Sequence, residues 1–256
     1  MIRIGLCKID YNKPEGDMLA DLPLWRKEKA NKIKIAKARK ESIAAGWLLK
    51  EEIKALNKTL YKASDKAYSK TTDYMYDKSE HGNILNFGYE IDLERVQFGD
   101  HGKPYLIDLN EMGIYFNITH TEGFAAVVIA DFPVGIDIER KTDKKFRITD
   151  RMFTDNEKNR IHKSENPERE FRIVWTEKES FLKNIGAGIT VPLNGFHIES
   201  EKHMVVSDGY DIQSKDYFVI SRYYEDEEFA LSLCIKGCGK YEETAKIMEK
   251  IKPGLI

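Results

Sequence analysis

Two carboxylates, Asp137 and Glu139, stand one residue apart in the segment 134–139. Their alternation with Ile136 and Ile138 predicts a strand, in which successive side chains point to opposite faces. The two acids would then share one face, where they repel each other unless a cation lies between them. Mg²⁺ is a cation that binds one or two carboxylates together with phosphates and water. A solvated edge strand would have the same spacing, so the acids alone do not establish a metal site.

A second set of charges belongs to a predicted helix that begins at Asn166, which is followed by Pro, and ends before Gly186. Asn–Pro is typical of a helix N-terminus. Trp175, Glu179 and Lys183 are four residues apart, so they share one helix face. A surface Glu–Lys pair is the alternative explanation, but the Trp on the same face favours the wall of a cleft.

Two further segments carry groups that bind phosphate. A Gly-Lys-Pro sequence places Lys103 in a predicted tight turn, which lacks the Walker pattern. Thr119 and His120 lie where a predicted strand, 115–119, enters a hairpin, and both side chains can donate hydrogen bonds. Each segment alone is explained equally well as a solvated turn. His120 has no neighbouring Cys or His, which argues against zinc.

The four segments together resemble the sequence pattern of the Sfp-type 4′-phosphopantetheinyl transferases. In chain order they are Gly102-Lys103-Pro104, Phe116-Asn117-Ile118-Thr119-His120, Gly135-Ile136-Asp137-Ile138-Glu139 and Trp175 to Lys183 followed by Gly-Ala-Gly. The resemblance is densest from Gly102 to Ile189. Thr119 and Thr121 stand where the family has serines, and both retain a hydroxyl; Ile189 stands for the common Leu.

The resemblance implies an enzyme that moves the phosphopantetheine arm of coenzyme A onto a serine of an apo acyl or peptidyl carrier protein. The second product would be adenosine 3′,5′-bisphosphate. By matched position, Asp137, Glu139 and Glu179 would hold the cofactor Mg²⁺. Glu179, or a water on the metal, would take the proton of the carrier serine. Such catalysis depends mainly on positioning and charge neutralisation.

The resemblance also implies which groups bind coenzyme A. Lys103, Thr119 and His120 would bind its 3′-phosphate and the neighbouring phosphate. Lys178 and Lys183 would neutralise the pyrophosphate, and Lys183 would protonate or stabilise the leaving group.

A basic segment, 25–54, carries ten Lys or Arg residues and four acids. Its apolar positions, which include Ile43, Ala44 and Leu48, predict one long amphipathic helix. The family uses a basic residue near here for the nucleotide of coenzyme A, so Arg39 is a candidate ligand. A solvated helix face explains most of the other charges.

The fold implied by the family is α+β, with two similar halves related by a pseudo-twofold, each a small antiparallel sheet packed with a long helix. A weak internal repeat agrees, because 124–130 resembles 229–235. We expect a phosphate-binding half, 1–131, with a polar insertion at about 61–88. The other half, 132–256, would carry the metal-binding carboxylates and the carrier side. A ligand site between two halves is common.

A capping box from Thr154 to Glu157 predicts a short helix. Just before it, Phe146, Ile148 and the pair at 152–153 are apolar. In the family this region receives the carrier protein, and core packing explains it equally well.

Composition restricts the remaining classes. The net charge of −2 does not suggest nucleic-acid binding. No run approaches the about eighteen apolar residues of a membrane span, and 1–9 has a strand pattern rather than that of a signal peptide. Cys7, Cys234 and Cys238 do not form a disulfide framework, which favours a reducing cytoplasm. The resemblance implies a monomer.

Two other functions stay open. A metal-dependent hydrolase of coenzyme A or a nucleotide would use the same carboxylates and lysines, but it leaves the joint order of the four segments unexplained. A non-catalytic carrier-binding homologue would be favoured by a missing acid or lysine, and none is missing. The sequence does not identify the carrier protein, the general base or the preference for Mg²⁺ over Mn²⁺.

Overall fold

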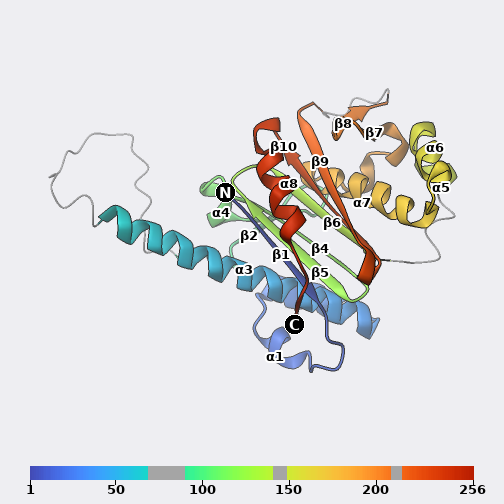
Figure 1. The fold of residues 1–256 in the computed structure, drawn as a ribbon. Helices are drawn as coiled ribbons and strands as arrows, with labels where there is room; N and C mark the ends of the chain where they lie inside the picture. The colour runs from blue at the N-terminus through green and yellow to red at the C-terminus, as the bar shows by residue number, and fades with distance from the viewer. Residues whose placement is uncertain (69–89, 141–148, 209–214) are drawn as a thin grey trace.

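The fold is that of a computed structural model, which describes residues 1–68, 90–140, 149–208 and 215–256 (Figure 1). Phe146, Ile148 and most of the predicted 61–88 insertion lie outside these residues. In chain order the helices and strands up to the middle of the chain are β1 (Ile2–Lys8), α1 (Gly16–Ala20), α2 (Leu24–Asn31), α3 (Ala36–Tyr68), β2 (Val96–Phe98), β3 (Pro104–Leu106), α4 (Ile107–Glu111), β4 (Tyr115–Thr121) and β5 (Phe124–Ala130). They are followed by β6 (Val134–Arg140), α5 (Thr149–Met152), α6 (Asp155–Lys163), α7 (Pro167–Ile185), β7 (Phe196–Glu199), β8 (Met204–Ser207), β9 (Tyr217–Tyr224), β10 (Phe229–Lys236), α8 (Tyr241–Lys250) and β11 (Gly254–Leu255).

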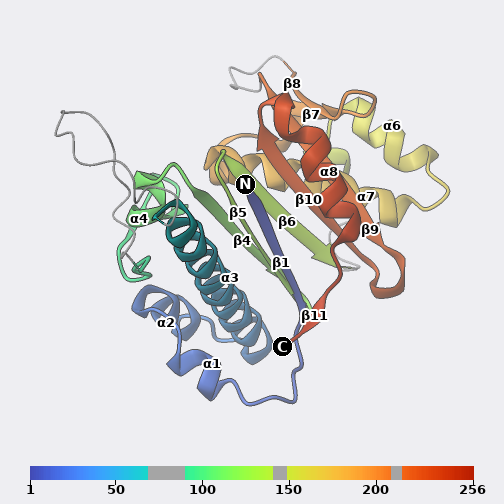
Figure 2. The same cartoon turned by 60° about the vertical axis from the view of Figure 1, so that its left-hand side comes forward.

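Two sheets form the body of the fold, with strand orders β11-β1-β5-β4 and β6-β10-β9-β8-β7. Each contains the same antiparallel unit: a first strand, then a long helix, then a hairpin whose last strand pairs with the first. The units are β1, α3, β4 and β5, and β6, α7, β9 and β10. This arrangement confirms the α+β fold built from small antiparallel sheets and long helices. The boundary at residue 131 stays a prediction, and β11 returns from the end of the chain to pair in parallel with β1 (Figure 2).

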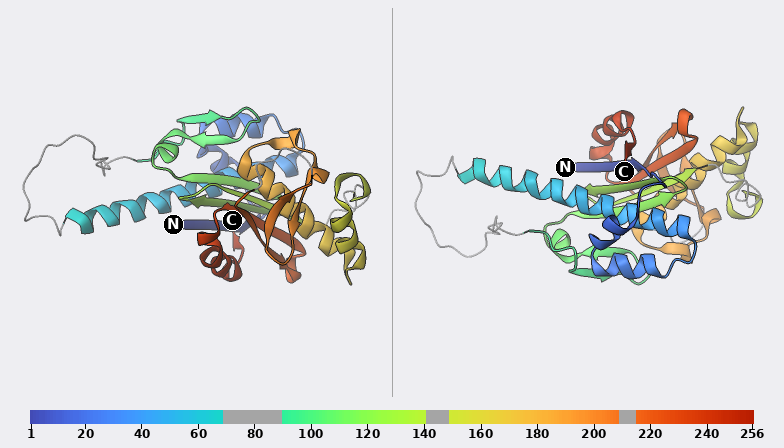
Figure 3. Two further views of the ribbon diagram at one scale, coloured as in Figure 1. Left: turned by 90° about the horizontal axis from the view of Figure 1, so that it is seen from above. Right: turned by 90° about the horizontal axis from the view of Figure 1, so that it is seen from below.

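Strand β5 shows why every residue of a central strand is buried here. Phe124, Ala126, Val128 and Ala130 pack into a core shared with the second sheet and α8. The alternate residues 125, 127 and 129 pack against α3. A strand covered on both faces is apolar throughout rather than alternating. In Figure 3, α8 lies on one side of the strands, and α1 and α2 lie on the other.

The two sheets meet along β4 and β6, and side chains of β4 join them. The Oδ1 atom of Asn117 accepts a hydrogen bond from the backbone N–H of Ile136 at 3.0 Å. The hydroxyl of Thr119 donates to Oδ1 of Asp137 at 3.0 Å, and the Thr121 hydroxyl accepts from the Arg140 N–H at 3.4 Å. These contacts place the polar end of β4 directly against the carboxylates of β6.

The predicted single helix over 25–54 is wrong: the chain forms α2, breaks at 32–35 and starts α3 at Ala36. The two helices pack through a small apolar cluster that includes Leu22, Ala30 and Ile43. Gly46 permits the close approach, because a Cβ atom there would lie 2.8 Å from Nε of Arg26. Folding α2 back on α3 changes which basic residues reach the site.

Two further features are the lengths of the apolar helices and the state of the cysteines. No helix among the described residues is long and apolar enough to cross a membrane. The three cysteines are free thiols, with Cys7 and Cys234 buried and Cys238 exposed.

Candidate active site

A cavity of about 410 Å³ lies where α2, β4, β6 and α7 meet. Its wall contains two opposite kinds of charge: carboxylates from the second sheet and its helix, and cationic or hydrogen-bonding groups from α2, β4 and α7. The polar residues concerned are Arg26, Lys29, Thr119, His120, Asp137, Glu139, Glu179 and Lys183. Six of the predicted site residues are therefore brought together, and Lys103, Lys178 and Arg39 are not among the residues that line the cavity.

Helix α7 has the bounds and orientation that its sequence predicts. The side chain of Asn166 caps its start by accepting from the Arg169 N–H at 3.0 Å, and Gly186 ends it in a left-handed conformation with φ 69°. Trp175, Glu179 and Lys183 all line the cavity. The predicted cleft-facing side of this helix is confirmed.

Strand β6 presents Asp137 and Glu139 to the same cavity, and each is only 6% exposed. Ile136 and Ile138 belong to the core, as the alternation predicts. The preceding Gly135 lets β6 touch α7, because a Cβ there would lie 2.2 Å from the backbone oxygen of Ser180. The glycine of this segment therefore sets the distance between the carboxylates and the helix.

Lys183, Asp137 and Thr119 form a hydrogen-bonded triangle. The Lys183 ammonium lies 2.5 Å from Oδ1 of Asp137 and 2.9 Å from the Thr119 hydroxyl. One carboxylate of the cavity is thus paired with a lysine of α7, the helix that also carries Glu179. The triangle also joins α7 to both sheets.

Sequence analysis missed Arg26 and Lys29, which α2 brings to the cavity. The Arg26 guanidinium donates to the backbone oxygen of Ser42, whereas its Nε has no hydrogen-bond partner among the described residues. Burial lowers the pKa of Arg26 to about 10. Burial and the neighbouring charges of Arg26 and Lys183 lower the pKa of Lys29. The sequence signal that could have identified them is a separate short helix over 24–31, because Arg26 and Lys29 lie on one face of it.

His120 stands between cations and a carboxylate. Burial and the charges of Arg26, Lys183 and Lys29 lower the pKa of its imidazole to about 4. Oε2 of Glu41 lies 3.9 Å from the His120 Nδ1. The imidazole is therefore neutral near pH 7 while the cavity holds no anion.

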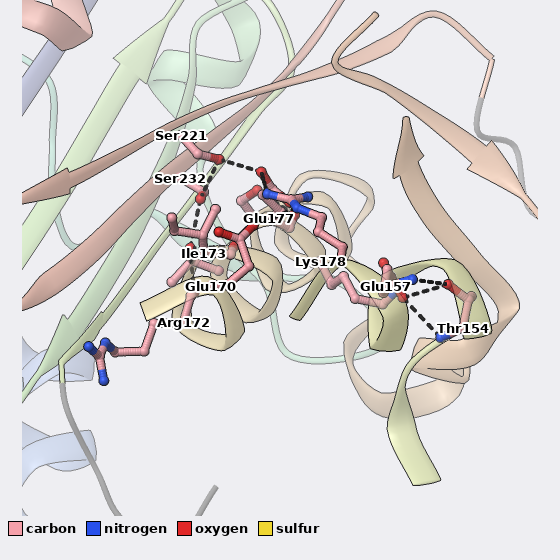
Figure 4. Close-up of polar contacts among 12 residues, drawn as sticks. Thr154, Glu157, Glu170, Arg172, Ile173, Glu177, Lys178, Ser221 and Ser232 are labelled. Carbon is pink, nitrogen blue, oxygen red and sulfur yellow. Dashed lines mark hydrogen bonds and ion pairs between the residues drawn. The ribbon is translucent and has the colours of Figure 1, made fainter. Parts of the chain in front are cut away.

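Lys178 is not among the residues that line this cavity, and Figure 4 shows it beside Glu157. Its fully buried ammonium donates to Oε1 of Glu157 at 2.6 Å and to the backbone oxygen of Phe196, and it lies 4.3 Å from the centre of the Phe196 ring. Glu157 also closes the predicted capping box with Thr154. The pair fastens α6 to α7, so contact of Lys178 with a pyrophosphate in the cavity would require a buried ion pair to break.

Lys103 and Arg39 also have other partners. Lys103 lies in the predicted turn and donates to the backbone oxygen of Asn184 at 2.7 Å. Burial lowers the pKa of Lys103 to about 8. Arg39 forms an ion pair with Glu15. Lys103 is next in sequence to a cavity residue, Pro104, whereas Arg39 and its partner Glu15 are not among the cavity residues.

The carboxylates can be tested as a metal site. Asp137, Glu139 and Glu179 offer the hard oxygen ligands that Mg²⁺ prefers and line one cavity. Among the described residues, however, no three His, Cys, Asp or Glu side chains are grouped closely enough to hold a metal ion. Lys183 and Thr119 both contact Oδ1 of Asp137. The donor chemistry fits Mg²⁺, and these contacts would have to open for Oδ1 to bind it.

Comparison with known proteins gives a consistent family. A family model described as the 4′-phosphopantetheinyl transferase superfamily matches residues 133–234. The chain is 35% identical over 125 residues to the 4′-phosphopantetheinyl transferase gsp of Aneurinibacillus migulanus, covering 48% of this chain and 50% of that protein. It is 30% identical over 155 residues to a 4′-phosphopantetheinyl transferase of Bacillus subtilis, covering 57% and 66%. It is 28% identical over 157 residues to 4′-phosphopantetheinyl transferase Sfp of Bacillus subtilis (strain 168), covering 59% and 68%.

These matches span about half to two thirds of the length of the curated relatives. Among solved structures, the holo-[acyl-carrier-protein] synthase of Thermotoga maritima aligns with a TM-score of 0.34 and 18% identity, covering 41% of this chain and 63% of that chain. A likeness of this size carries no inference about the chemistry of the cavity.

Proposed function

We propose that the chain is a 4′-phosphopantetheinyl transferase, as the family match over residues 133–234 and the relatives support, and that it transfers 4′-phosphopantetheine from coenzyme A to a serine of an apo acyl or peptidyl carrier protein. The serine oxygen forms a bond to the phosphorus that carries pantetheine. The bond from that phosphorus to the bridging pyrophosphate oxygen breaks, and adenosine 3′,5′-bisphosphate and one proton are released. The observation that supports this most is one cavity lined both by the carboxylates Asp137, Glu139 and Glu179 and by the cations Arg26, Lys29 and Lys183.

The cationic groups suit a ligand with several phosphates. Arg26, Lys29 and Lys183 surround His120 closely enough to depress its pKa. Lys183 is already paired with Asp137. Burial disfavours the charged forms of Arg26 and Lys29, and a bound phosphate would stabilise those charges. We assign the 3′-phosphate of coenzyme A to Thr119 and His120, as the family resemblance implies, with Arg26 and Lys29 added by the structure.

Mg²⁺ would be held by Asp137, Glu139 and Glu179. When bound, it would supply positive charge to the pyrophosphate oxygens. The chain's own contribution is to bring these three carboxylates to one cavity, with Asp137 and Glu139 on one face of β6 and Glu179 on α7.

Two side chains of α7 act on protons and charge. Glu179 accepts the proton of the carrier serine, because a serine hydroxyl is a weak nucleophile without a base. Lys183 stabilises the leaving 5′-phosphate, since its ammonium lies one helical turn from Glu179 and already faces the cavity. Lys103 can bind a phosphate of coenzyme A only if it releases the backbone oxygen of Asn184.

The proposed partners are coenzyme A and an apo carrier protein. We expect the chain to act as a monomer in the cytoplasm, because the site is built from residues of one chain and the cysteines are free. Nucleic acid is not an expected partner.

Intact-mass spectrometry of an apo carrier protein tests the proposal. With this protein, coenzyme A and Mg²⁺, the carrier should gain one phosphopantetheine. A carrier whose acceptor serine is replaced by alanine should gain nothing, and EDTA should abolish the reaction. No gain on carriers of the fatty-acid, polyketide and nonribosomal-peptide types would contradict the proposal.

A further inference from the structure

Asn184 is a buried polar residue that directly follows Lys183 on α7. Its Nδ2 donates to the backbone oxygen of Cys234 at 2.9 Å and to that of Pro133 at 3.2 Å. Cys234 lies on β10, and Pro133 directly precedes β6. One side-chain amide therefore ties the last turn of α7 to two strands of the second sheet.

The backbone of Asn184 is held as well. Its carbonyl oxygen accepts from the Lys103 ammonium at 2.7 Å, which connects α7 to the turn between β2 and β3. A Cβ atom at Gly135 would lie 2.4 Å from the Asn184 nitrogen, so strand and helix backbones are in direct contact here. The helix cannot shift along β6 at this point without losing these hydrogen bonds or creating a clash.

The place of this contact matters for Lys183. Asp137, which pairs with the Lys183 ammonium at 2.5 Å, lies two residues after Gly135 on the same strand. The backbone of α7 at Lys183 is thus held in a fixed position relative to β6, the strand that carries Asp137. A lysine stem is flexible, so the position of its backbone limits where the ammonium can reach.

We propose that Asn184 is a positioning residue, which holds the end of α7 against β6 and β10 so that the Lys183 ammonium meets the leaving phosphate. The inference rests on the proposed transferase function. It requires no contact between Asn184 and substrate, and Asn184 is not among the residues that line the cavity.

The other polar atom of the Asn184 side chain, Oδ1, indicates that the residue acts through its Nδ2 donor. Its Oδ1 is buried and has no hydrogen-bond partner among the described residues. A buried acceptor without a partner is unfavourable. Leucine has a similar shape and would remove the costly oxygen. It would also remove all three Nδ2 contacts, namely those with the backbone oxygens of Pro133 and Cys234 and the one with the Cys234 Sγ at 3.6 Å, so Asn184→Leu is a direct test of them.

A double-mutant cycle between Asn184→Leu and Lys183→Met provides the experiment. Rates are measured under single-turnover conditions, so that slow variants are still quantified, and thermal unfolding of each variant gives its folded fraction. Because a misplacement of about 1 Å can cost about a hundredfold, we expect Asn184→Leu to lower the rate of transfer about tenfold to a hundredfold. The apparent affinity for coenzyme A should stay within about twofold. In the Lys183→Met background, Asn184→Leu should change the rate by less than about twofold.

Val174→Ala is the matched control, since Val174 is buried in the first half of the same helix and packs in a separate apolar cluster. Its effect on the rate should be the same with and without Lys183. If Asn184→Leu does not fold, Asn184→Ala replaces it in the cycle. Full additivity of the Asn184 and Lys183 changes in an active protein would overturn the positioning role. A wild-type protein that transfers nothing would overturn the proposed function instead.

Discussion

The ammonium of Lys183 lies 2.5 Å from Oδ1 of Asp137, and this pair connects α7 to β6. The same ammonium contacts the Thr119 hydroxyl at 2.9 Å, so a residue of the first sheet takes part. Without substrate, Lys183 therefore serves as a counter-ion for one carboxylate. Under the proposed function, a bound pyrophosphate would give the lysine a second anion, and Asp137 would then have an oxygen available for a metal ion.

Lys29 gives the clearest test of the phosphate side. Lys29→Gln removes a cation of the cavity wall, and a hydrogen bond to a charged group is worth about 1.5–3 kcal/mol. We expect the dissociation constant for coenzyme A to rise about tenfold or more. Isothermal titration calorimetry measures it directly.

Lys27→Gln is the control for that change, because Lys27 is on the same helix but is not among the cavity residues. It alters the net charge equally. Equal losses of affinity in both variants would mean that Lys29 acts only through long-range charge.

Binding of coenzyme A should be coupled to protonation of His120. In the protein without ligand, the pKa of the His120 imidazole is about 4. A bound phosphate would raise this pKa, because it favours the charged form. Affinity is therefore highest at low pH and falls as pH rises from about 4 up to the pKa of the complex, above which it is constant. Titrations in two buffers of different ionisation enthalpy give the number of protons taken up.

His120→Gln provides the reference for that experiment, because it keeps the proton uptake of the coenzyme A phosphates and lacks the imidazole. The variant should take up fewer protons than the wild-type protein near pH 6. Identical uptake would show that His120 does not face the bound phosphate.

Gly135→Ala should destabilise the fold by about 1–3 kcal/mol, the usual cost of overpacking. The added Cβ would meet the backbone of Ser180 and Asn184, which cannot move aside like a flexible side chain. Gly16→Ala is the control, since a Cβ there has nothing within 4 Å. Urea unfolding of both variants is the measurement, and equal midpoints would contradict the close contact of β6 and α7.

Lys178→Met separates a structural lysine from a phosphate-binding one. Removing one member of a buried ion pair costs about 3–5 kcal/mol, so we expect a large loss of stability because Glu157 keeps its charge. Adding Glu157→Gln should restore part of it. Calorimetric titration of the folded variant should give wild-type affinity for coenzyme A; a large loss of affinity with unchanged stability would place Lys178 at the pyrophosphate after all.

The directions of the cavity side chains on β6 and α7 could be predicted, because they depend on local periodicity. The alternation at Asp137 and Glu139, and the four-residue spacing of Glu179 and Lys183, fix side-chain directions as soon as the strand and the helix form. The caps of α7 determine its ends. These features need no knowledge of the rest of the fold, and the cavity contains all four residues.

The cations of α2 reach the cavity through tertiary contacts, which explains why the sequence analysis did not find them. Arg26 and Lys29 reach the cavity only because the chain breaks at 32–35 and α2 folds back on α3. The direction of Lys178 is set by Glu157, a partner on another helix. Motif matching gives the position of a lysine in the chain, but its partner is decided by packing.

The most direct test follows both products of the reaction at once. Coenzyme A, Mg²⁺ and the protein are incubated with an apo carrier, with its serine-to-alanine variant or with no carrier, and adenosine 3′,5′-bisphosphate and carrier mass are measured together. We predict one adenosine bisphosphate for each modified carrier, none without the acceptor serine, and loss of both products with Glu179→Gln. Cleavage of coenzyme A at an equal rate without a carrier would contradict transfer and identify a hydrolase.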